Sequence, residues 1–244
     1  MVLSLNSIRA FLAALLVPLS ASATLAQPLL APAEVVLYIS PALKSTAFLG
    51  PLICMLKRVL IAPVETVRLD IAFSREMYAT RTQLDVEKVA QHFHQVTAKD
   101  GGPQSFKYLL LPHDLKAPKL NYVFSTSFGN HTTAFHVGVV STARLVGPTR
   151  DRQHGPDVTT ARAYKLILKS VARLSGYQGP DRCVLDFPRN LDELDQKSHE
   201  FCPADREALV AAKILKSEER ESGDCAPVAE KVPKRSLIAD LRAR

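Results

Sequence analysis

The sequence has no tryptophan, and aromatic residues make up only 7% of its 244 residues. Its basic residues are scattered and no nucleic-acid-binding motif accompanies them, so the net charge of +7 does not indicate a nucleic-acid partner. Weak attraction to anionic cell-envelope surfaces explains this charge better. The chain also lacks a Gly-x-Ser-x-Gly elbow and a P-loop pattern, which leaves nucleophilic catalysis with little support.

Long apolar runs are also absent, and this excludes a membrane-spanning helix in the body of the chain. Beyond the amino terminus, no segment reaches the roughly 18 uninterrupted apolar residues that such a helix needs. The amino terminus has one basic residue, Arg9, followed by an apolar stretch from Ala10 to Leu19 and the small residues Ala21-Ser22-Ala23. This order predicts a signal peptide over residues 1–23, with cleavage after Ala26 as the second choice. We therefore expect a secreted or periplasmic protein.

The remaining chain has the composition of a globular protein, with 47% hydrophobic and 23% charged residues. We expect one domain over residues 24–216. Residues 217–244 change to charges, prolines and small residues, which predicts a disordered charged tail.

Strand and helix patterns alternate along the domain, which favours an α/β sheet packed on helices. The expected strands are 34–39, 67–72, 106–111, 122–127 and 135–141. The expected helices are 45–59, 83–98, 157–175 and 203–216.

The expected helix at 157–175 has two contrasting faces. One is apolar and is made by Tyr164, Ile167, Leu168, Val171 and Leu174. On the other, Lys165, Lys169 and Arg173 repeat every four residues. This basic stripe is either a solvated face or the wall of an anion-binding groove.

The region after this helix resembles a zinc peptidase family. Gly176 lies where the turn glycine of the metzincin pattern follows the helix. Downstream, the runs Cys183-Val184-Leu185-Asp186-Phe187, Asn190-Leu191-Asp192-Glu193-Leu194-Asp195 and Glu200-Phe201-Cys202-Pro203 are similar to the archaemetzincins. Asn121-Tyr122-Val123-Phe124 and Val139-Val140-Ser141-Thr142-Ala143-Arg144-Leu145 extend the resemblance upstream. It implies a metzincin-like single domain, a twisted mixed sheet packed on helices that include a degenerate active-site helix.

The residues that this family uses for catalysis are replaced. The resemblance places the three zinc-binding histidines at Lys169, Arg173 and Gly179, and the catalytic glutamate at Ser170. Ammonium and guanidinium groups have no available lone pair at neutral pH. Two positive charges 4 Å apart repel each other by about 4 kcal/mol at an effective dielectric near 20, so we expect these positions to repel zinc.

The second zinc of the family is held by four cysteines, of which this sequence keeps Cys183 and Cys202. In an oxidising compartment we expect these two to form a disulfide worth about 3 kcal/mol. The alternative is a mixed zinc site made by Cys183, His199, Cys202 and Asp205. Cys54 and Cys225 are candidates for a second disulfide.

The histidines offer no obvious replacement for the lost ligands. His92 and His94 are two apart on a helix and point to different faces. His131 and His136 are five apart near a strand, so they face opposite sides. His113 and His154 are isolated. We expect solvated or singly hydrogen-bonded side chains.

These observations favour a secreted archaemetzincin-like metallopeptidase homologue that is catalytically inactive and needs no cofactor. It would bind a peptide or an anionic ligand in the former active-site cleft through Lys165, Lys169 and Arg173. One alternative is an active zinc-dependent peptidase with a rearranged metal site, and another is a purely structural cell-envelope protein.

Overall fold

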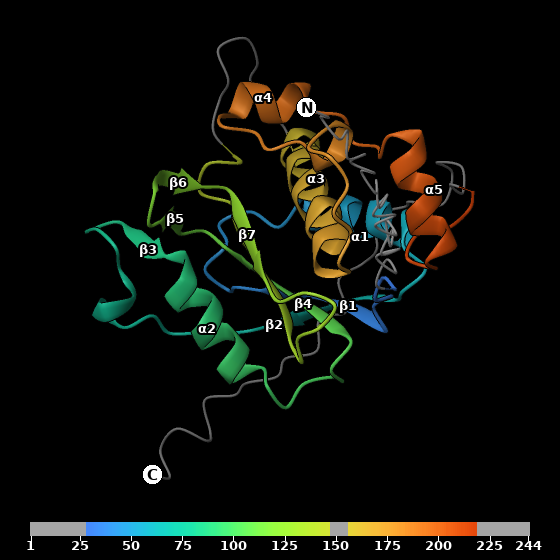
Figure 1. Cartoon of the computed structure of the whole chain (residues 1–244). Coiled ribbons are helices and arrows are strands. Elements are labelled where there is room, and N and C mark those ends of the chain that lie inside the picture. The colour runs from blue at the N-terminus through green and yellow to red at the C-terminus, as the bar shows by residue number, and fades with distance from the viewer. Residues whose placement is uncertain (1–27, 147–155, 219–244) are drawn as a thin grey trace, which may run out of the picture.

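The computed structural model describes residues 28–146 and 156–218 of the chain (Figure 1). The expected signal peptide at 1–23 and all but the start of the expected tail at 217–244 lie outside them, so both stay predictions. The bounds of the expected single domain, residues 24–216, also stay predictions. Of the described helices, none combines the length and the apolar character needed to cross a bilayer.

Strand β1 (Glu34–Ile39) lies inside a five-stranded sheet and is buried along most of its length. It pairs in parallel with β2 (Val64–Arg68) and β4 (Ser105–Leu111). The sheet continues through parallel β8 (His136–Ser141) to antiparallel β7 (Ser125–Phe128), giving the order β2-β1-β4-β8-β7. Antiparallel β7 therefore forms one edge of an otherwise parallel sheet.

Helices α1 (Leu49–Val59) and α3 (Pro156–Leu174) cover one face of this sheet (Figure 1). Val35 and Leu37 of β1 point into the core on that side. The apolar face expected of α3 is confirmed, since all five of its predicted members are buried: Tyr164, Ile167, Leu168, Val171 and Leu174.

Helix α2 (Val86–Val96) covers the opposite face and packs on a second core. Tyr38 of β1 lies edge-on to Phe93 of α2, with ring centroids 5.2 Å apart. Because neighbouring residues of a strand point to opposite faces, β1 supplies side chains to both cores. The α/β sheet with helices on both faces confirms the predicted fold class.

A small second sheet lies beside the first and was not predicted. Its order is β3-β5-β6, with β3 (Gln83–Asp85), β5 (Asp114–Ala117) and β6 (Leu120–Val123). A single 3-10 turn, η1 (Arg75–Met77), precedes it. The expected strand at 122–127 is wrong as one element, because β6 pairs in this small sheet and β7 in the large one.

Several predicted boundaries shift because of tertiary pairing and capping. The expected strand at 67–72 begins earlier as β2, since only residues 64–68 lie opposite β1. The expected helix at 83–98 divides where Asp85 caps α2 by accepting hydrogen bonds from the main-chain N–H groups of Glu87 and Lys88. The helix expected at 203–216 ends at Ala211.

The carboxyl-terminal part of the described chain packs over α3. It contains the 3-10 turn η2 (Cys183–Leu185), helix α4 (Leu191–Gln196) and helix α5 (Pro203–Ala211). Helix α5 ends before 216 because Lys213 adopts a left-handed conformation with φ of 58°. Val184, Leu194 and Leu209 anchor these three elements in the same core as α3.

Candidate functional site

A cavity of about 430 Å³ opens between α3, strand β7 and the loop that follows η2. Lys169, Ser170 and Arg173 of α3 line it, together with Ser125 to Ser127 of β7. Phe187 to Arg189 form the opposite wall. Three cationic residues and no acidic residue line this cavity among the described residues. The structure therefore brings three of the four degenerate positions to one place.

Arg173 is the most extensively bonded of these residues. Its guanidinium donates hydrogen bonds to the carbonyl oxygens of Tyr177 and Gly179, at 3.0 and 2.9 Å, and to the carboxylate of Asp181 at 2.7 Å. The fourth degenerate position, Gly179, is thus joined to α3 by a hydrogen bond from Arg173. A guanidinium held in this way directs its donors to protein oxygens.

Lys169 has fewer strong partners. Its ammonium donates a hydrogen bond to the carbonyl oxygen of Asp186 at 3.1 Å and lies 3.9 Å from the carboxylate of Asp181. It also lies 5.1 Å from the centre of the Phe187 ring, within range of a cation–π contact. Burial lowers the pKa of Lys169, and the charge of Asp181 partly offsets this effect.

Asp181 changes the electrostatics expected from the sequence. The sequence predicted two mutually repelling cations at positions 169 and 173, whereas the structure places the carboxylate of Asp181 within 4 Å of both. The Asp181 side chain is 61% exposed, so water screens both ion pairs. The two cations are therefore partly neutralised, and Arg173 more so than Lys169.

Ser170 occupies the floor of the cavity. It is buried, and within the described part of the chain the Tyr108 hydroxyl is the group close enough to interact with its Oγ. The nearby hydroxyl of Tyr108 is also buried, which raises the pKa of that tyrosine. A serine hydroxyl cannot replace a carboxylate as a general base.

Lys165 does not belong to the cavity, which corrects the predicted three-residue ligand-binding stripe. It is buried, and its ammonium donates hydrogen bonds to the carbonyl oxygens of Leu194 and Asp195, each at 2.9 Å. Four residues exceed one helical turn, so the stripe rotates around α3 and passes beneath α4. Lys165 caps the end of α4 instead of facing a ligand.

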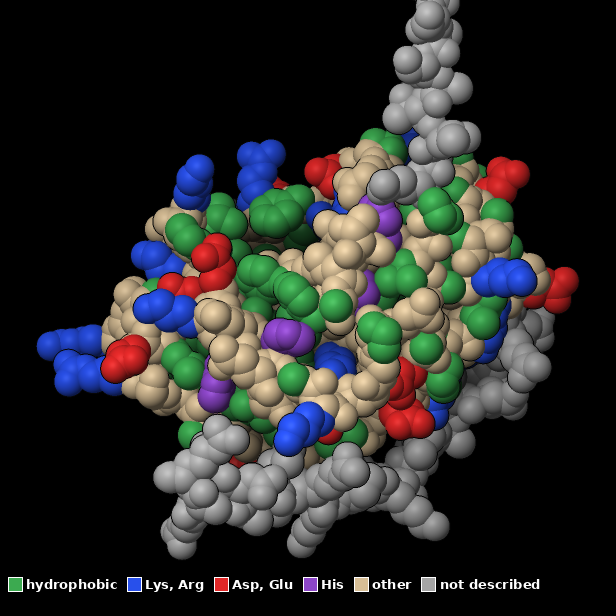
Figure 2. All heavy atoms as spheres, turned by 60° about the horizontal axis from the view of Figure 1, so that its bottom comes forward, with side chains coloured by type: hydrophobic (Ala, Val, Ile, Leu, Met, Phe, Trp, Pro, Cys, Tyr) green, Lys and Arg blue, Asp and Glu red, His purple; other side chains and the backbone are tan. Residues whose placement is uncertain are grey.

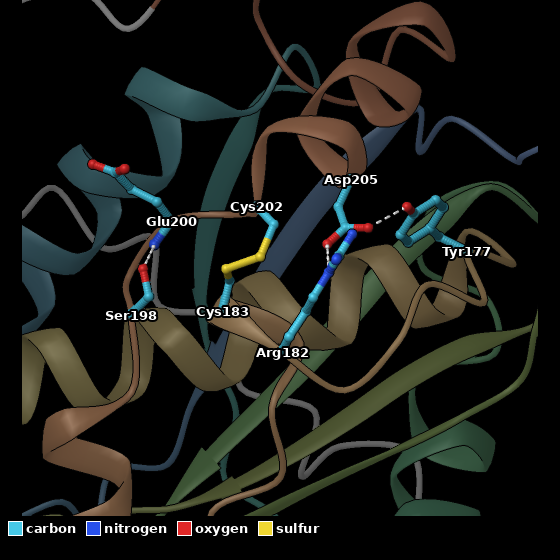
Figure 3. The surroundings of a disulfide bond; sticks show 7 residues. All are labelled: Tyr177, Arg182, Cys183, Ser198, Glu200, Cys202 and Asp205. Atoms are coloured by element: carbon cyan, nitrogen blue, oxygen red, sulfur yellow. Dashed lines mark hydrogen bonds and ion pairs between the residues drawn. A yellow bond between two sulfur atoms is a disulfide. The ribbon is translucent and has the colours of Figure 1, made fainter.

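The predicted disulfide between Cys183 and Cys202 is present, with Cα atoms 5.6 Å apart (Figure 3). Asp205 lies beside it and is fully buried. Its carboxylate accepts hydrogen bonds from the Tyr177 hydroxyl at 2.7 Å and from Arg182 Nε at 3.4 Å (Figure 3). Burial and the Asp205 carboxylate raise the pKa of Tyr177 to about 12.

The alternative zinc site at Cys183, His199, Cys202 and Asp205 does not form in this geometry. Both sulfurs are bonded to each other, and Asp205 is bonded to Tyr177 and Arg182. The His199 side chain is 63% exposed and lies 3.4 Å from Glu200. The second disulfide proposed for Cys54 stays a prediction, because Cys225 lies outside the described residues.

The other histidines in the described parts of the chain do not converge on a metal position either. His136 is buried with its two ring nitrogens 3.0 and 2.8 Å from the carbonyl oxygens of Pro103 and Asn130. Within residues 28–146 and 156–218, no three histidine, cysteine, aspartate or glutamate side chains gather closely enough to hold an ion. His154 lies outside these ranges.

Polar residues around the cavity that sequence reasoning missed include Asp181, Arg189 and Lys197. Lys197 is buried beside Lys169 and Lys165, and its ammonium has no hydrogen-bond partner in the described residues. Burial, reinforced by the charge of Lys169, lowers the pKa of Lys197 to about 7. A lone lysine in a polar stretch gives no signal of burial in the sequence.

Comparison with known proteins places the chain among the archaemetzincins. No family model matches it. It is 31% identical over 133 residues to the archaemetzincin of Aeropyrum pernix, covering 53% of this chain and 67% of that protein. It is 34% identical over 146 residues to the archaemetzincin of Pyrobaculum aerophilum, covering 60% of this chain and 82% of that protein.

Solved structures show the same fold. The zinc-dependent peptidase of Methanocorpusculum labreanum matches with a TM-score of 0.58 at 22% identity, over 72% of this chain and 100% of that one. The Methanopyrus kandleri archaemetzincin matches with a TM-score of 0.55 at 21% identity, over 73% of this chain and 94% of that one. The Archaeoglobus fulgidus archaemetzincin, complexed with malonate, has a TM-score of 0.51 at 20% identity, over 71% of this chain and 99% of that one.

Proposed function

Because the chain belongs to the archaemetzincin family, we propose that it is a catalytically inactive member that binds a peptide or an anionic ligand in the cavity beside α3. The observation that carries this proposal is the set of side chains at the metal-binding positions. Lys169 and Arg173 are cations bonded to protein oxygens, and Ser170 is a neutral hydroxyl. These positions hold no imidazole and no general base.

Zinc, the metal that the family implies, does not fit these residues. A zinc site needs deprotonated nitrogen, sulfur or oxygen donors arranged as a tetrahedron. The guanidinium of Arg173 has no free lone pair to offer a metal, and Gly179 offers only a carbonyl that already accepts a hydrogen bond from Arg173. A side chain at position 179 would also collide with the Tyr177 ring, whose hydroxyl is bonded to Asp205.

The cavity itself supports a binding role. Its volume of about 430 Å³ lies within the range of small-molecule and peptide pockets. Its three cationic residues favour an anion, and a relative of the same fold is complexed with malonate, a dicarboxylate. Edge strand β7 supports a peptide, because an edge strand offers unpaired main-chain groups to an extended chain.

We further propose that the protein acts outside the cytoplasm. The signal-peptide pattern of residues 1–23 supports this placement, and so does the Cys183–Cys202 disulfide, because disulfides persist in oxidising compartments.

The test is a zinc-content measurement on the purified protein together with a peptide-cleavage screen, with and without a chelator. We expect substoichiometric zinc and no chelator-sensitive cleavage. A matched positive control is the variant Lys169→His/Ser170→Glu/Arg173→His/Gly179→His with Tyr177→Ala, which supplies the missing donors and the space for them. Stoichiometric zinc with chelator-sensitive cleavage by the unaltered protein would show that it is an active peptidase.

A purely structural role is separated from ligand binding by thermal-shift screening with peptides and small carboxylates. A protein that binds a ligand in its folded state gains stability in proportion to ligand concentration over Kd. A structural protein without a ligand would show no shift with any probe.

A further inference from the structure

Arg189 differs from the other two cations that line the cavity, because Lys169 and Arg173 form ion pairs with Asp181 and Arg189 forms none among the described residues. Its main chain is held in place on both sides: its N–H donates to Glu193 Oε2 at 2.7 Å, and its carbonyl accepts from the Tyr122 hydroxyl at 2.7 Å. Among the described residues, its guanidinium makes no ion pair with any carboxylate, unlike that of Arg173. A fixed main chain thus holds Arg189, an exposed residue, in the lining of the cavity.

Lys169 and Ser170 add polar groups to the same cavity. The Lys169 ammonium can donate three hydrogen bonds and uses one, to the carbonyl of Asp186. Ser170 lies in the cavity lining, and its buried Oγ is close enough to the buried Tyr108 hydroxyl to interact with it. A serine hydroxyl both donates and accepts, so Ser170 can accept from Tyr108 and still donate to a ligand oxygen.

Exposed apolar side chains form the rim. Four large hydrophobic residues are strongly exposed among those described, and two of them, Leu120 at 42% and Phe187 at 52%, line this cavity. Tyr122, Phe124 and Leu166 continue the apolar surface inward. The cavity therefore suits a ligand with one apolar group and one anionic group.

The edge of β7 favours a peptide over a free acid. The main-chain N–H of Ser141 donates a hydrogen bond to the carbonyl oxygen of Phe124. Along the two antiparallel strands, the next pair of opposite residues is Ser125 and Val140. Hydrogen-bonded and non-hydrogen-bonded pairs alternate along antiparallel strands, so the main-chain groups of Ser125 and Ser127 point away from β8. Both residues line the cavity and can bond to an extended chain.

We propose that this cavity binds the carboxyl-terminal residue of a partner peptide, with the free α-carboxylate at Arg189, Lys169 and Ser170 and an apolar side chain against Phe187 and Leu120. This inference rests on the proposed binding function and specifies its ligand as a chain terminus. Selectivity for a free carboxyl end comes from ion pairing with Arg189 and Lys169, because a neutral amide accepts hydrogen bonds from these cations but carries no negative charge.

The experiment uses isothermal titration calorimetry of the purified protein with three probes: N-acetyl-Ala-Ala-Phe as the free acid, the same tripeptide as the C-terminal amide, and 3-phenylpropanoate. We expect the acid to bind at least about tenfold more tightly than the amide, since hydrogen bonds to charged groups contribute at that level. We expect 3-phenylpropanoate to bind more weakly than the tripeptide acid, because it cannot bond to β7.

Arg189→Gln should remove most of the difference between acid and amide, and Arg81→Gln, an exposed arginine far along the sequence, should keep it. Equal binding of acid and amide would overturn the carboxylate assignment while leaving a peptide-binding cavity. A preference for the acid that survives Arg189→Gln would overturn the role of Arg189. Tight binding of 3-phenylpropanoate alone would assign the cavity to a small free acid, and zinc-dependent cleavage of the probes would refute the proposed function itself.

Discussion

Arg173 donates a hydrogen bond of 2.9 Å to the carbonyl oxygen of Gly179. The sequence resemblance predicts that the second and third histidine ligands of the family correspond to these two positions. If this prediction is correct, a hydrogen bond connects two positions that a metal ion connects in the active enzymes. Through Tyr177 O and Asp181, the same guanidinium ties the whole turn after α3 to the helix.

Arg173→Ala should therefore loosen this turn. Loss of three hydrogen bonds from a partly buried guanidinium should lower the free energy of unfolding by about 1–3 kcal/mol. Urea denaturation measures the loss, and hydrogen exchange at residues 177–182 should increase. Arg75→Ala, at an exposed arginine in η1, is the control and should change the free energy of unfolding by less than about 0.5 kcal/mol. Unchanged exchange at 177–182 would mean that Arg173 does not hold the turn.

The sequence predicted the fold because its strongest patterns are local. The buried runs of β1, β4 and β8 and the apolar face of α3 depend on side-chain periodicity alone. The small sheet was missed because β3 and β5 are short and polar, and their pairing depends on which segments the fold brings together.

The candidate site was predicted only in part. Lys169, Ser170 and Arg173 do share one cavity, as helical spacing requires. Spacing could not show that Lys165 lies beneath α4, because that depends on where α4 packs. Nor could it show that Asp181 returns to neutralise Lys169 and Arg173, since loop geometry determines that contact.

Asp181→Asn tests the balance of charge in the cavity. Removing this carboxylate leaves Lys169 and Arg173 more available to an anion, so the free-acid tripeptide should bind up to about fivefold more tightly. Titration calorimetry at low and high NaCl measures the effect, and the gain should shrink as salt screens the charges. Asp70→Asn, at an exposed aspartate before the small sheet, should leave binding unchanged. Weaker binding by Asp181→Asn would indicate that Asp181 orders the cavity instead of competing with the ligand.

Lys197 makes the free energy of unfolding depend on pH. Its pKa is lowered from 10.5 in the unfolded chain to about 7 in the folded protein, chiefly by burial. Between these two values the unfolded chain binds more protons, so this residue makes the free energy of unfolding rise with pH. Below about pH 7 the folded protein carries the full cost of a buried ammonium without a hydrogen-bond partner in the described residues.

Lys197→Met should remove this cost. We expect the free energy of unfolding to increase by about 1–3 kcal/mol at pH 6 and the gain to disappear near pH 10. Urea denaturation across this pH range measures it, with Lys99→Met, at an exposed lysine, as the control. A stabilisation that is the same at both pH values would come from packing and would exclude titration of Lys197 as its cause.

The Cys183–Cys202 disulfide and the Asp205 cluster hold the same loop by different means. The disulfide closes a loop with a sequence separation of 19, and Arg182, next to Cys183, pairs with Asp205 of α5. Asp181, one residue earlier, pairs with Arg173 of α3. Three consecutive residues thus bind three different partners. Breaking one of these contacts should therefore weaken the other two.

Cys183→Ala/Cys202→Ala should lower the free energy of unfolding by about 3 kcal/mol, the chain-entropy value for a loop of this length. It should also increase hydrogen exchange at residues 177–182 and weaken binding of the free-acid tripeptide, because the loop from Cys183 to Arg189, which carries one wall of the cavity, loses an anchor. Dithiothreitol should reproduce these effects in the variant Cys54→Ala/Cys225→Ala, which lacks the cysteines of the other predicted disulfide, so that the response comes from Cys183–Cys202. If stability falls while exchange at 177–182 and binding stay the same, the disulfide stabilises the fold without organising the cavity.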